Sequence, residues 1–265
     1  MELSTPVGLL LGFGAMIATM VIEGGNPASL LNVPAFVIVF IGTLGATFVT
    51  FPLARVMGLP GLLGQTFKPV DADPQSLIDL FVKLADQARR EGLLSLEEQA
   101  NKIENVFVRK GIMLVVDGVD PAVVREIMET DTHLVSQRHK GGYAVLEAMG
   151  GYSPTLGILG TVMGLINVLS HLSEPEKLGH SIATAFIATL YGVAFANLVW
   201  LPLGKKLKQK SETEVVTREV AIEGVLSVQA GENPRIVREK LESFLAPKLR
   251  GQEPKKEVVP EPSQA

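Results

Sequence analysis

Four long apolar runs dominate the pattern of this chain, at residues 6–22, 34–54, 148–170 and 182–203. Each is close to the ~20 residues that a helix needs to cross a hydrocarbon core of about 30 Å. Hydrophobic residue types make up 47% of the chain and the mean hydropathy is +0.30, both more than a charged globular surface usually leaves. The pattern predicts four membrane-spanning helices.

The distribution of Lys and Arg predicts how these helices are oriented. Segments 23–33 and 171–181 contain only one such residue, Lys177. Basic residues instead follow the second and fourth runs: Arg55, Lys68, Lys205, Lys206, Lys208 and Lys210. Because basic loops stay mainly in the cytoplasm, we expect both termini there. The first run lacks the basic flank and cleavage site of a signal peptide, so we expect it to be retained.

The segment between the second and third runs has the pattern of soluble helices. Apolar residues recur at helical spacing in two groups, Leu77, Leu80, Phe81 and Leu84, and Val123, Val124, Ile127 and Leu134. The charged stretch 205–228 is expected to continue the fourth run as a helix.

Local residues predict where the soluble helices begin. Asp73 and Asp120 each precede a Pro, which is the pattern of an N-cap followed by the first helical position. Gly92 interrupts the chain, and Ser95 and Glu98 have the spacing of a capping box.

The predicted fold class is an all-α membrane protein with a cytoplasmic helical domain. Residues 251–265 are rich in Pro, Glu and Lys and have little to bury, so we expect a disordered tail. The predicted domains are 1–54 (transmembrane helices 1 and 2), 55–145 (cytoplasmic helical domain), 146–204 (transmembrane helices 3 and 4), 205–250 (cytoplasmic C-terminal helices) and 251–265 (tail).

Several functional classes are disfavoured by what the sequence contains. The chain has no cysteine, which excludes disulfides, thiolate metal ligands and a cysteine nucleophile. It also has no basic patch interleaved with aromatic residues that would suggest binding of nucleic acid. No nucleophile, base and orienting group can be assembled around the spans, so we do not expect an enzyme. The glycines of the apolar runs are expected to pack helices closely rather than bind phosphate: Gly12, Gly14, Gly157, Gly160 and Gly164.

The predicted spans contain no ionisable side chain in their apolar interior, although an isolated ion conductor would normally need one. They contain neutral polar residues instead: Ser153, Thr155, Thr161, Thr184, Thr189, Tyr191 and Asn197. Pro154 frees a backbone carbonyl beside them, which could ligate an ion or form a hinge. Such hydroxyls also commonly bond their own helix, so packing is the alternative interpretation.

Three stretches resemble the MotA/PomA family of flagellar motor stator subunits, in the MotA/TolQ/ExbB superfamily. They are SPTLGILGTVMGL from Ser153, ATLYG from Ala188 with Ala196 and Asn197, and ARREGLLSLEE from Ala88. The likeness covers residues 1 to about 250 with runs and loops in the family's order.

The resemblance implies a homopentameric ring in the lipid of the bacterial inner membrane. The ring would surround the two membrane helices of a MotB/PomB-like dimer, whose Asp carries H⁺ or Na⁺. The resemblance places Pro154, Thr155, Thr161 and Thr189 by the ion path and Phe186 against the partner helices. No cofactor is implied beyond the transported ion.

The resemblance also assigns a rotor contact and an ion. Arg89, Arg90, Glu97 and Glu98 would meet the rotor protein FliG, with a solvated helix face as the alternative. Thr161 lies where sodium-driven relatives often carry Thr, so Na⁺ is favoured, with Thr161 and Thr189 as transient ligands. His133, His139, His171 and His180 have no convincing metal-site spacing and are expected at the surface.

Two other functions stay open. An ExbB/TolQ-like energiser would couple the ion gradient to another envelope machine, but such proteins have three spans. A non-conducting membrane scaffold would only recruit partners.

Overall fold

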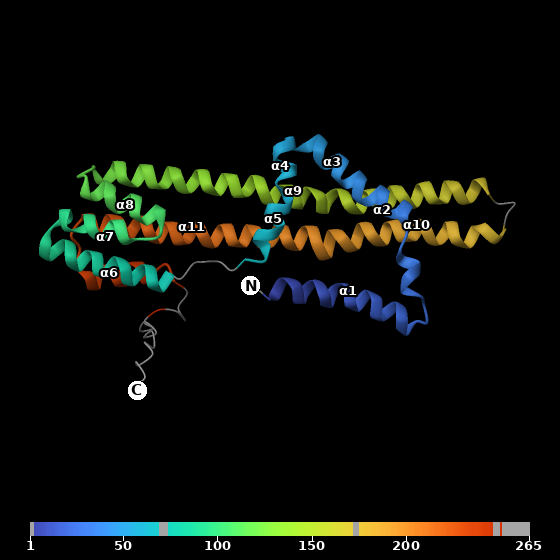
Figure 1. The fold of residues 1–265 in the computed structure, drawn as a ribbon, viewed down its shortest axis with the longest axis horizontal. Coiled ribbons are helices and arrows are strands. Elements are labelled where there is room, and N and C mark those ends of the chain that lie inside the picture. The colour runs from blue at the N-terminus through green and yellow to red at the C-terminus, as the bar shows by residue number, and fades with distance from the viewer. Residues whose placement is uncertain (1–2, 69–73, 172–174, 246–249, 251–265) are drawn as a thin grey trace, which may run out of the picture. The chain divides into compact units, whose positions relative to one another are not determined.

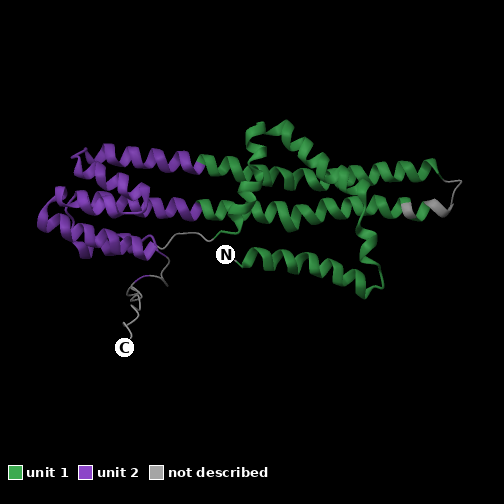
Figure 2. Ribbon diagram, viewed as in Figure 1, with its two compact units in different colours: residues 1–70, 137–211 green, residues 71–136, 212–265 purple. Residues whose placement is uncertain are grey.

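The computed structural model describes residues 3–68, 74–171, 175–245 and 250. All regular structure in these residues is helical (Figure 1). The chain divides into two compact units (Figure 2): unit 1 comprises residues 1–70 and 137–211, and unit 2 comprises residues 71–136 and 212–265. The predicted all-α class is confirmed.

Unit 1 contains the apolar helices. Its elements are α1 (Ser4–Ile22), the 3₁₀ turn η1 (Pro27–Leu30), α2 (Val33–Phe36), the π-helical η2 (Val37–Ile41), α3 (Gly42–Thr50), α4 (Leu53–Met57), α5 (Leu59–Thr66), α10 (Pro175–Phe195) and the π-helical η4 (Ala196–Trp200). It also includes parts of two long helices, α9 (Pro121–Ser170) and α11 (Leu201–Gln229).

Four helices are long and apolar enough to cross a membrane, judged by length and composition: Ser4–Ile22, Val33–Thr50, Pro121–Ser170 and Ser181–Gln229. The second is shorter than the predicted 34–54. It ends at Thr50 because Phe51 is extended, with φ −121° and ψ 150°, before Pro52. An extended residue before proline is expected from the clash of the proline ring with a helical neighbour.

The third apolar run is not a separate helix. It forms the second half of α9, a continuous helix of 50 residues that passes through Pro154. The fourth run continues through η4 into α11, so the predicted helix over 205–228 is confirmed.

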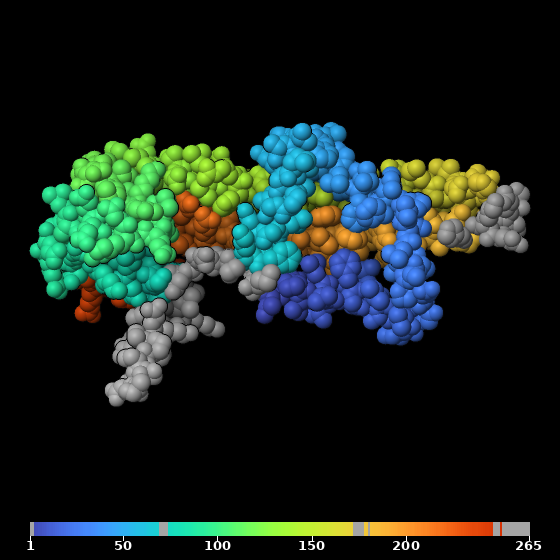
Figure 3. Space-filling view, in the orientation of Figure 1, coloured from blue at the N-terminus to red at the C-terminus, as the bar shows by residue number. Residues whose placement is uncertain are grey.

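Helices α4 and α5 cover one side of α9 in unit 1 (Figure 3). The Arg55 guanidinium lies against Gly141, where an added Cβ would be 3.1 Å from its Cζ. Leu62 packs in the same way on Gly142, where an added Cβ would be 3.0 Å from its Cδ2. Two adjacent glycines thus give α4 and α5 a flat surface on which to pack.

Unit 2 has a conventional apolar core. Its own helices are α6 (Pro74–Glu91), η3 (Leu93–Ser95), α7 (Leu96–Lys102), α8 (Val106–Val116) and α12 (Pro234–Glu242). Leu77, Phe81 and Leu84 are buried, as the periodicity of α6 predicts. In α9 the buried face instead passes through Val124 and Met128, while Val123 and Leu134 are exposed.

The predicted helix starts have mixed outcomes. Asp120 caps α9, because its Oδ1 accepts from the Ala122 N–H at 2.8 Å. Pro74 begins α6, but Asp73 lies outside the described residues. The capping box is wrong: the Ser95 hydroxyl donates to the Gly92 carbonyl at 2.7 Å. Gly92 has φ +82°, which explains why the chain turns there.

Candidate functional site

Helices α9 and α10 touch through their backbones in unit 1. A Cβ added to Gly192 would lie 2.5 Å from the Ser153 carbonyl oxygen and 3.1 Å from the Gly157 Cα. A Cβ added to Gly157 would lie 2.8 Å from the Ala188 carbonyl oxygen. Because real Cβ atoms do not approach so closely, only glycine permits this contact, which we call the glycine seam.

Two further glycines extend the glycine seam along α9. Added Cβ atoms on Gly160 and Gly164 would meet the Cβ atoms of Ala188 and Ala185 at 2.7 and 2.6 Å. The packing role predicted for Gly157, Gly160 and Gly164 is therefore confirmed. An added Cβ on Gly12 would lie 2.9 Å from the Leu198 Cδ2, whereas one on Gly14 would meet no described atom of this chain within 4 Å.

Thr161 and Thr189 face each other across the glycine seam. Their hydroxyl groups are in direct hydrogen-bond contact. The Thr161 Oγ1 also lies 2.9 Å from the Ala185 carbonyl and 3.2 Å from the Gly157 carbonyl. The Thr189 Oγ1 lies 3.3 Å from the same Gly157 carbonyl. These four oxygens, from Thr161, Thr189, Gly157 and Ala185, form what we call the oxygen cluster.

The oxygen cluster contains more acceptors than donors. Each hydroxyl has one proton, and each carbonyl has lone pairs but no proton. The two protons cannot serve every close oxygen pair at the same time. The cluster is therefore neutral and electron-rich, which suits a small cation or a relayed proton.

The other predicted ion-path residues occupy different surroundings. Ser153 is fully buried and donates to the Gly192 carbonyl at 3.1 Å, which ties α9 to α10. Pro154 lies within the glycine seam, with its Cα 3.1 Å from an added Cβ on Gly192. Thr155 is exposed and its hydroxyl donates to the Tyr152 carbonyl at 2.8 Å, outside the oxygen cluster. Phe186 is 63% exposed, so it presents an apolar ring to the surroundings.

A second polar group holds the loop before α2 against α10. The Asn32 Nδ2 donates to the Thr184 Oγ1 at 3.0 Å, and the Tyr191 hydroxyl donates to the Leu30 carbonyl. The Asn32 Oδ1 also caps α2 by accepting from the Ala35 N–H at 2.9 Å. Sequence reasoning missed Asn32, although an Asn before Val33-Pro34 is a typical N-cap signal.

The four predicted rotor-binding charges all lie on exposed positions of unit 2. Arg90 pairs with Asp86 at 3.0 Å, and Glu98 pairs with Lys102 at 2.6 Å. The hydrogen bond from Lys102 lowers the pKa of Glu98. Arg89 and Glu97 have no ion pair with any described residue, so their charges face solvent unneutralised.

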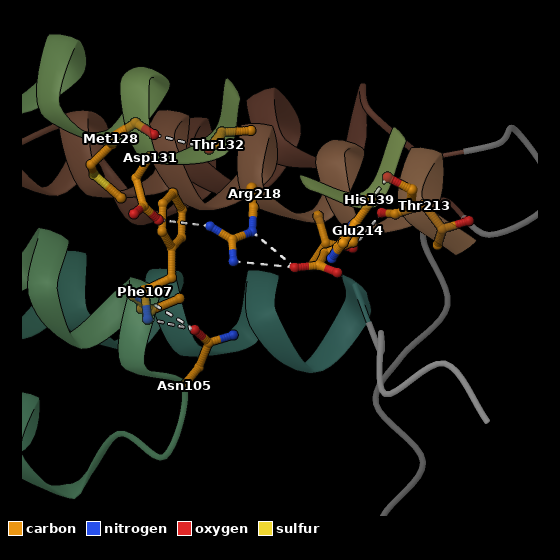
Figure 4. A network of polar contacts seen from close by, with 12 residues as sticks. Asn105, Phe107, Met128, Asp131, Thr132, His139, Thr213, Glu214 and Arg218 are labelled. Atoms are coloured by element: carbon orange, nitrogen blue, oxygen red, sulfur yellow. Dashed lines mark hydrogen bonds and ion pairs between the residues drawn. The ribbon is translucent and has the colours of Figure 1, made fainter. Parts of the chain in front are cut away.

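A partly buried arginine links three helices of unit 2 (Figure 4). The Arg218 Nη1 lies 2.9 Å from Asp131 and its Nη2 lies 3.1 Å from Glu214. Its guanidinium carbon stands 4.6 Å from the centre of the Phe107 ring. The cation thus links α9, α11 and α8, a geometry in which Arg stacks well on an aromatic face.

A second ion network fixes the C-terminal helix of unit 2. Lys240 lies 2.5 Å from Glu223 and 3.2 Å from Glu232, and Arg125 lies 3.4 Å from Glu223. Partial burial alone would raise the pKa of Glu223, but hydrogen bonds and charge from Lys240 and Arg125 outweigh it and lower that pKa. The Glu223 hydrogen bond raises the pKa of Lys240.

The described histidines belong to no candidate metal site. Among the residues that the structure describes, no group of three or more His, Cys, Asp or Glu side chains could hold a metal ion. His133 is exposed and His139 is partly exposed, with its Nδ1 3.2 Å from the Ser211 Oγ. The His171 Nδ1 lies 2.9 Å from the Asn167 carbonyl, and the side chain of His180 lies outside the description.

Known proteins resemble this chain along nearly its whole length. Residues 99–220 match the model of the MotA/TolQ/ExbB proton channel family. Motility protein A of Bacillus subtilis (strain 168) is 39% identical over 94% of this chain and 93% of its own. Chemotaxis protein PomA of Vibrio alginolyticus is 36% identical over 92% and 96%.

A solved structure agrees with the sequence relatives. The structure of C. jejuni MotAB matches with a TM-score of 0.88 and 31% identity, covering 96% of this chain and 98% of that chain. Two of the three stretches that carried the resemblance, those that begin at Ser153 and Ala188, fall inside the family-model match, whereas the stretch from Ala88 precedes it. The chain belongs to the MotA/PomA branch of the MotA/TolQ/ExbB proton channel family, whose members here are motility proteins and not enzymes.

Proposed function

We propose that this chain is the ring-forming subunit of a flagellar motor stator, which uses ion flow through the inner membrane to turn a rotor. Five copies surround the two membrane helices of a MotB/PomB-like dimer. All four apolar helices cross the membrane and both termini lie in the cytoplasm. The relatives named Motility protein A and the MotAB structure support this role.

The observation that carries the proposal is the oxygen cluster, together with an exposed apolar ring three residues before Thr189 on α10. Thr161 and Thr189 offer neutral oxygens, and Phe186 exposes an apolar surface on the same helix as Thr189. The apolar interior of these helices contains no carboxylate to carry the ion. A partner helix that docks against Phe186 and brings an Asp would complete the path.

The proposed cycle is a rotary ratchet. An ion that binds the partner Asp neutralises it, which lowers the cost of moving that side chain past apolar surroundings. One charge that crosses 100 mV releases about 2.3 kcal/mol, which is several times the thermal energy. A single ion can therefore bias one step of the ring relative to the two partner helices that it surrounds.

The proposed ion is Na⁺. Dehydrated Na⁺ needs several oxygen ligands, whereas a proton needs only the Asp and a hydrogen-bonded path. The oxygen cluster supplies up to four such ligands, from Thr161, Thr189, Gly157 and Ala185. The chain itself would hold no permanent cofactor.

The proposed rotor contact is electrostatic and reversible. Arg89 and Glu97 offer charges that no described residue neutralises, while Arg90 and Glu98 would have to exchange their internal partners. Exposed pairs contribute little free energy, about 0–1 kcal/mol each, but they speed and orient association. A stepping contact with a FliG-like protein needs this combination.

Complementation tests the role directly. The chain and its own MotB-like partner are expressed in a cell that lacks its native stator, and rotation of tethered cells is recorded. Rotation that stops when the membrane gradient is dissipated supports the proposal. Gradient-dependent uptake through another envelope machine without rotation would identify an ExbB/TolQ-like energiser, and no gradient-dependent activity would identify a scaffold.

The ion is tested by varying external Na⁺ at fixed pH and membrane potential. We expect motor speed to rise with Na⁺ and this dependence to weaken with Thr161→Ala. Speed that ignores Na⁺ in the unmodified protein would make it a proton motor while leaving the stator role intact.

A further inference from the structure

One end of unit 1 concentrates positive charge. The described basic residues of that end outnumber its single described carboxylate, Glu147, and the next carboxylates along α11, Glu212 and Glu214, lie just beyond unit 1. The basic residues are Arg55, Lys68, Arg138, Lys140, Lys205, Lys206, Lys208 and Lys210. Their hydrogen bonds show which of these cations hold other parts of the fold.

Contacts within unit 1 bring the segments that carry these charges to one level. The His139 Nδ1 lies 3.2 Å from the Ser211 Oγ, which aligns α9 with α11. The Arg55 guanidinium lies against Gly141, which brings in α4. The charges therefore form a band around the bundle, which we call the basic belt.

Two lysines of the basic belt serve the fold. The Lys206 Nζ donates to the Ser4 hydroxyl at 3.0 Å, at the start of α1. The Lys210 Nζ donates to the Gln65 carbonyl at 2.9 Å and also to the Lys68 carbonyl, beyond the end of α5. Cations at the C-terminal end of a helix satisfy its last carbonyls and suit its dipole.

Four other cations of the basic belt have no ion-pair partner among the described residues. They are Arg138, Lys140, Lys205 and Lys208, and all four are exposed. Lys205 and Lys208 lie three residues apart on α11, so they share one face of the helix. Unpaired cations next to membrane-spanning helices complement the phosphates of anionic lipids.

We propose that Arg138, Lys140, Lys205 and Lys208 bind the headgroups of anionic phospholipids where the bundle leaves the membrane. The inference rests on the membrane location in the proposed function and adds a lipid class and a site. Phosphate oxygens accept hydrogen bonds from Lys and Arg, and Arg can make two such bonds at once. Arg138 and Lys140 are two residues apart and point to different sides of α9, so more than one headgroup would be bound.

The test compares two double variants with the same change of charge. Lys205→Gln/Lys208→Gln removes two belt cations, and Lys83→Gln/Lys110→Gln removes two exposed lysines of unit 2. The full complex with its MotB-like partner is purified from nanodiscs of equal phosphatidylglycerol and phosphatidylcholine. The ratio of the two lipids retained after detergent washing is measured by mass spectrometry.

We expect the unmodified complex and the Lys83/Lys110 variant to retain phosphatidylglycerol preferentially. In the Lys205/Lys208 variant, each removed charge should lower the ratio of retained phosphatidylglycerol to phosphatidylcholine about fivefold. Equal retention by all three complexes, or equal loss by both variants, would overturn the site. Displacement of the lipid by millimolar inorganic phosphate at constant ionic strength would assign the belt to free phosphate and overturn the lipid assignment.

The outcome is separable from the proposed function. A Lys205/Lys208 variant that still supports rotation and keeps its lipid preference rejects only the lipid site. An unmodified complex that never supports rotation, whatever it retains, rejects the stator role.

Discussion

The core of unit 2 and the contact between α9 and α10 in unit 1 bury different kinds of residue. The largest fully buried side chains of unit 2 are bulky, among them Phe81, Ile78, Leu96 and Ile112. At the contact between α9 and α10 in unit 1, the buried positions are small: Gly157, Ser153, Ala185, Ala188 and Gly192. Water rewards the burial of large apolar groups, whereas lipid does not, so membrane helices gain mainly from close contact. The core of unit 2 should fail when atoms are removed, and the contact between α9 and α10 should fail when atoms are added.

The largest effect is expected where the glycine seam is tightest. Gly192→Ala should abolish assembly of the complex, because its methyl group would stand 2.5 Å from the Ser153 carbonyl and must push the backbones apart. Size-exclusion chromatography of the complex measures this. The control is Gly151→Ala on α9, where an added Cβ meets nothing within 4 Å. A stable Gly192→Ala complex would contradict the close-contact account of unit 1.

The oxygen cluster should be the next most sensitive feature. Thr189→Val keeps the shape but removes a hydroxyl, so we expect ion-driven rotation to fall at least tenfold, the effect of ~1.4 kcal/mol on a barrier. Thr155→Val is the matched control, since its hydroxyl bonds only the Tyr152 carbonyl among the described groups. Rotation speed and assembly are measured together. Equal speeds for both variants would leave Thr189 as a packing residue.

Removal of atoms should damage unit 2. Phe81 is 0% exposed and packs against Gly224, where an added Cβ would lie 2.4 Å from its ring. Phe81→Ala should cost about 3–5 kcal/mol by leaving a cavity. Limited proteolysis of the assembled complex in urea reports this loss, with cleavage sites in unit 2 located by mass spectrometry. Leu94→Ala, at a position 75% exposed, should change little.

Charge reversal should have a smaller effect that is confined to the rotor contact. Arg89→Glu and Glu97→Lys should each reduce rotor binding about two- to fivefold, since an exposed pair contributes up to ~1 kcal/mol. Arg90→Glu should additionally disturb its own helix, because it breaks the pair with Asp86. Compensating reversals on the rotor protein should restore torque for Arg89 and Glu97. Undiminished torque in single and double reversals would indicate a merely solvated face.

The smallest effect concerns pH. Glu223 has a lowered pKa, so its stabilising contribution is present above its ordinary value of 4.5 and lost as pH falls through the lower folded value. Lys240 has a raised pKa, so its contribution is present below 10.5 and lost as pH rises beyond it. Lys240→Gln should lower the stability of unit 2 by up to ~1 kcal/mol between these limits. A urea midpoint that stays unchanged by Lys240→Gln at neutral pH would contradict this.

Much of the fold followed from local rules in the sequence. Hydropathy found the apolar helices, and Asp120 marked the start of α9 because its side chain meets the Ala122 N–H directly. Apolar helices and helix starts depend on residues that are close in the chain, so the spacing of residue types in the sequence identifies them. Pro74 at the first position of α6 belongs to the same class.

Features that depend on distant parts of the chain were missed or wrong. The continuity of α9 from Pro121 into the third apolar run was not predicted, because the domain boundary was placed where the hydropathy changes, although the helix does not end there. Ser95 lacked the predicted capping bond because Gly92 turns the chain and offers its carbonyl first. The contribution of the Gly157 and Ala185 carbonyls to the oxygen cluster was also missed, because every residue has a backbone oxygen and the sequence does not show which ones come together.

The candidate site was only partly visible in advance. Sequence reasoning chose Thr161 and Thr189, which the structure brings together, but also Thr155, which lies outside the oxygen cluster. All three are threonines in apolar helices, so residue type could not separate them. They differ in whether the side chain lies at the contact between α9 and α10, and the glycines determine where the two helices make that contact.

The glycine seam also determines how far apart the side chains of α9 and α10 are held. Where two backbones touch, the spacing between Thr161 and Thr189 is set by direct backbone contact instead of by adaptable side chains. Exposed residues of these helices, such as Leu159 and Val193, can then vary with the surrounding lipid without disturbing the ligand spacing. Ion preference and membrane compatibility would be inherited as separate traits, so a related chain could change its ion through one hydroxyl while keeping the rest of its surface.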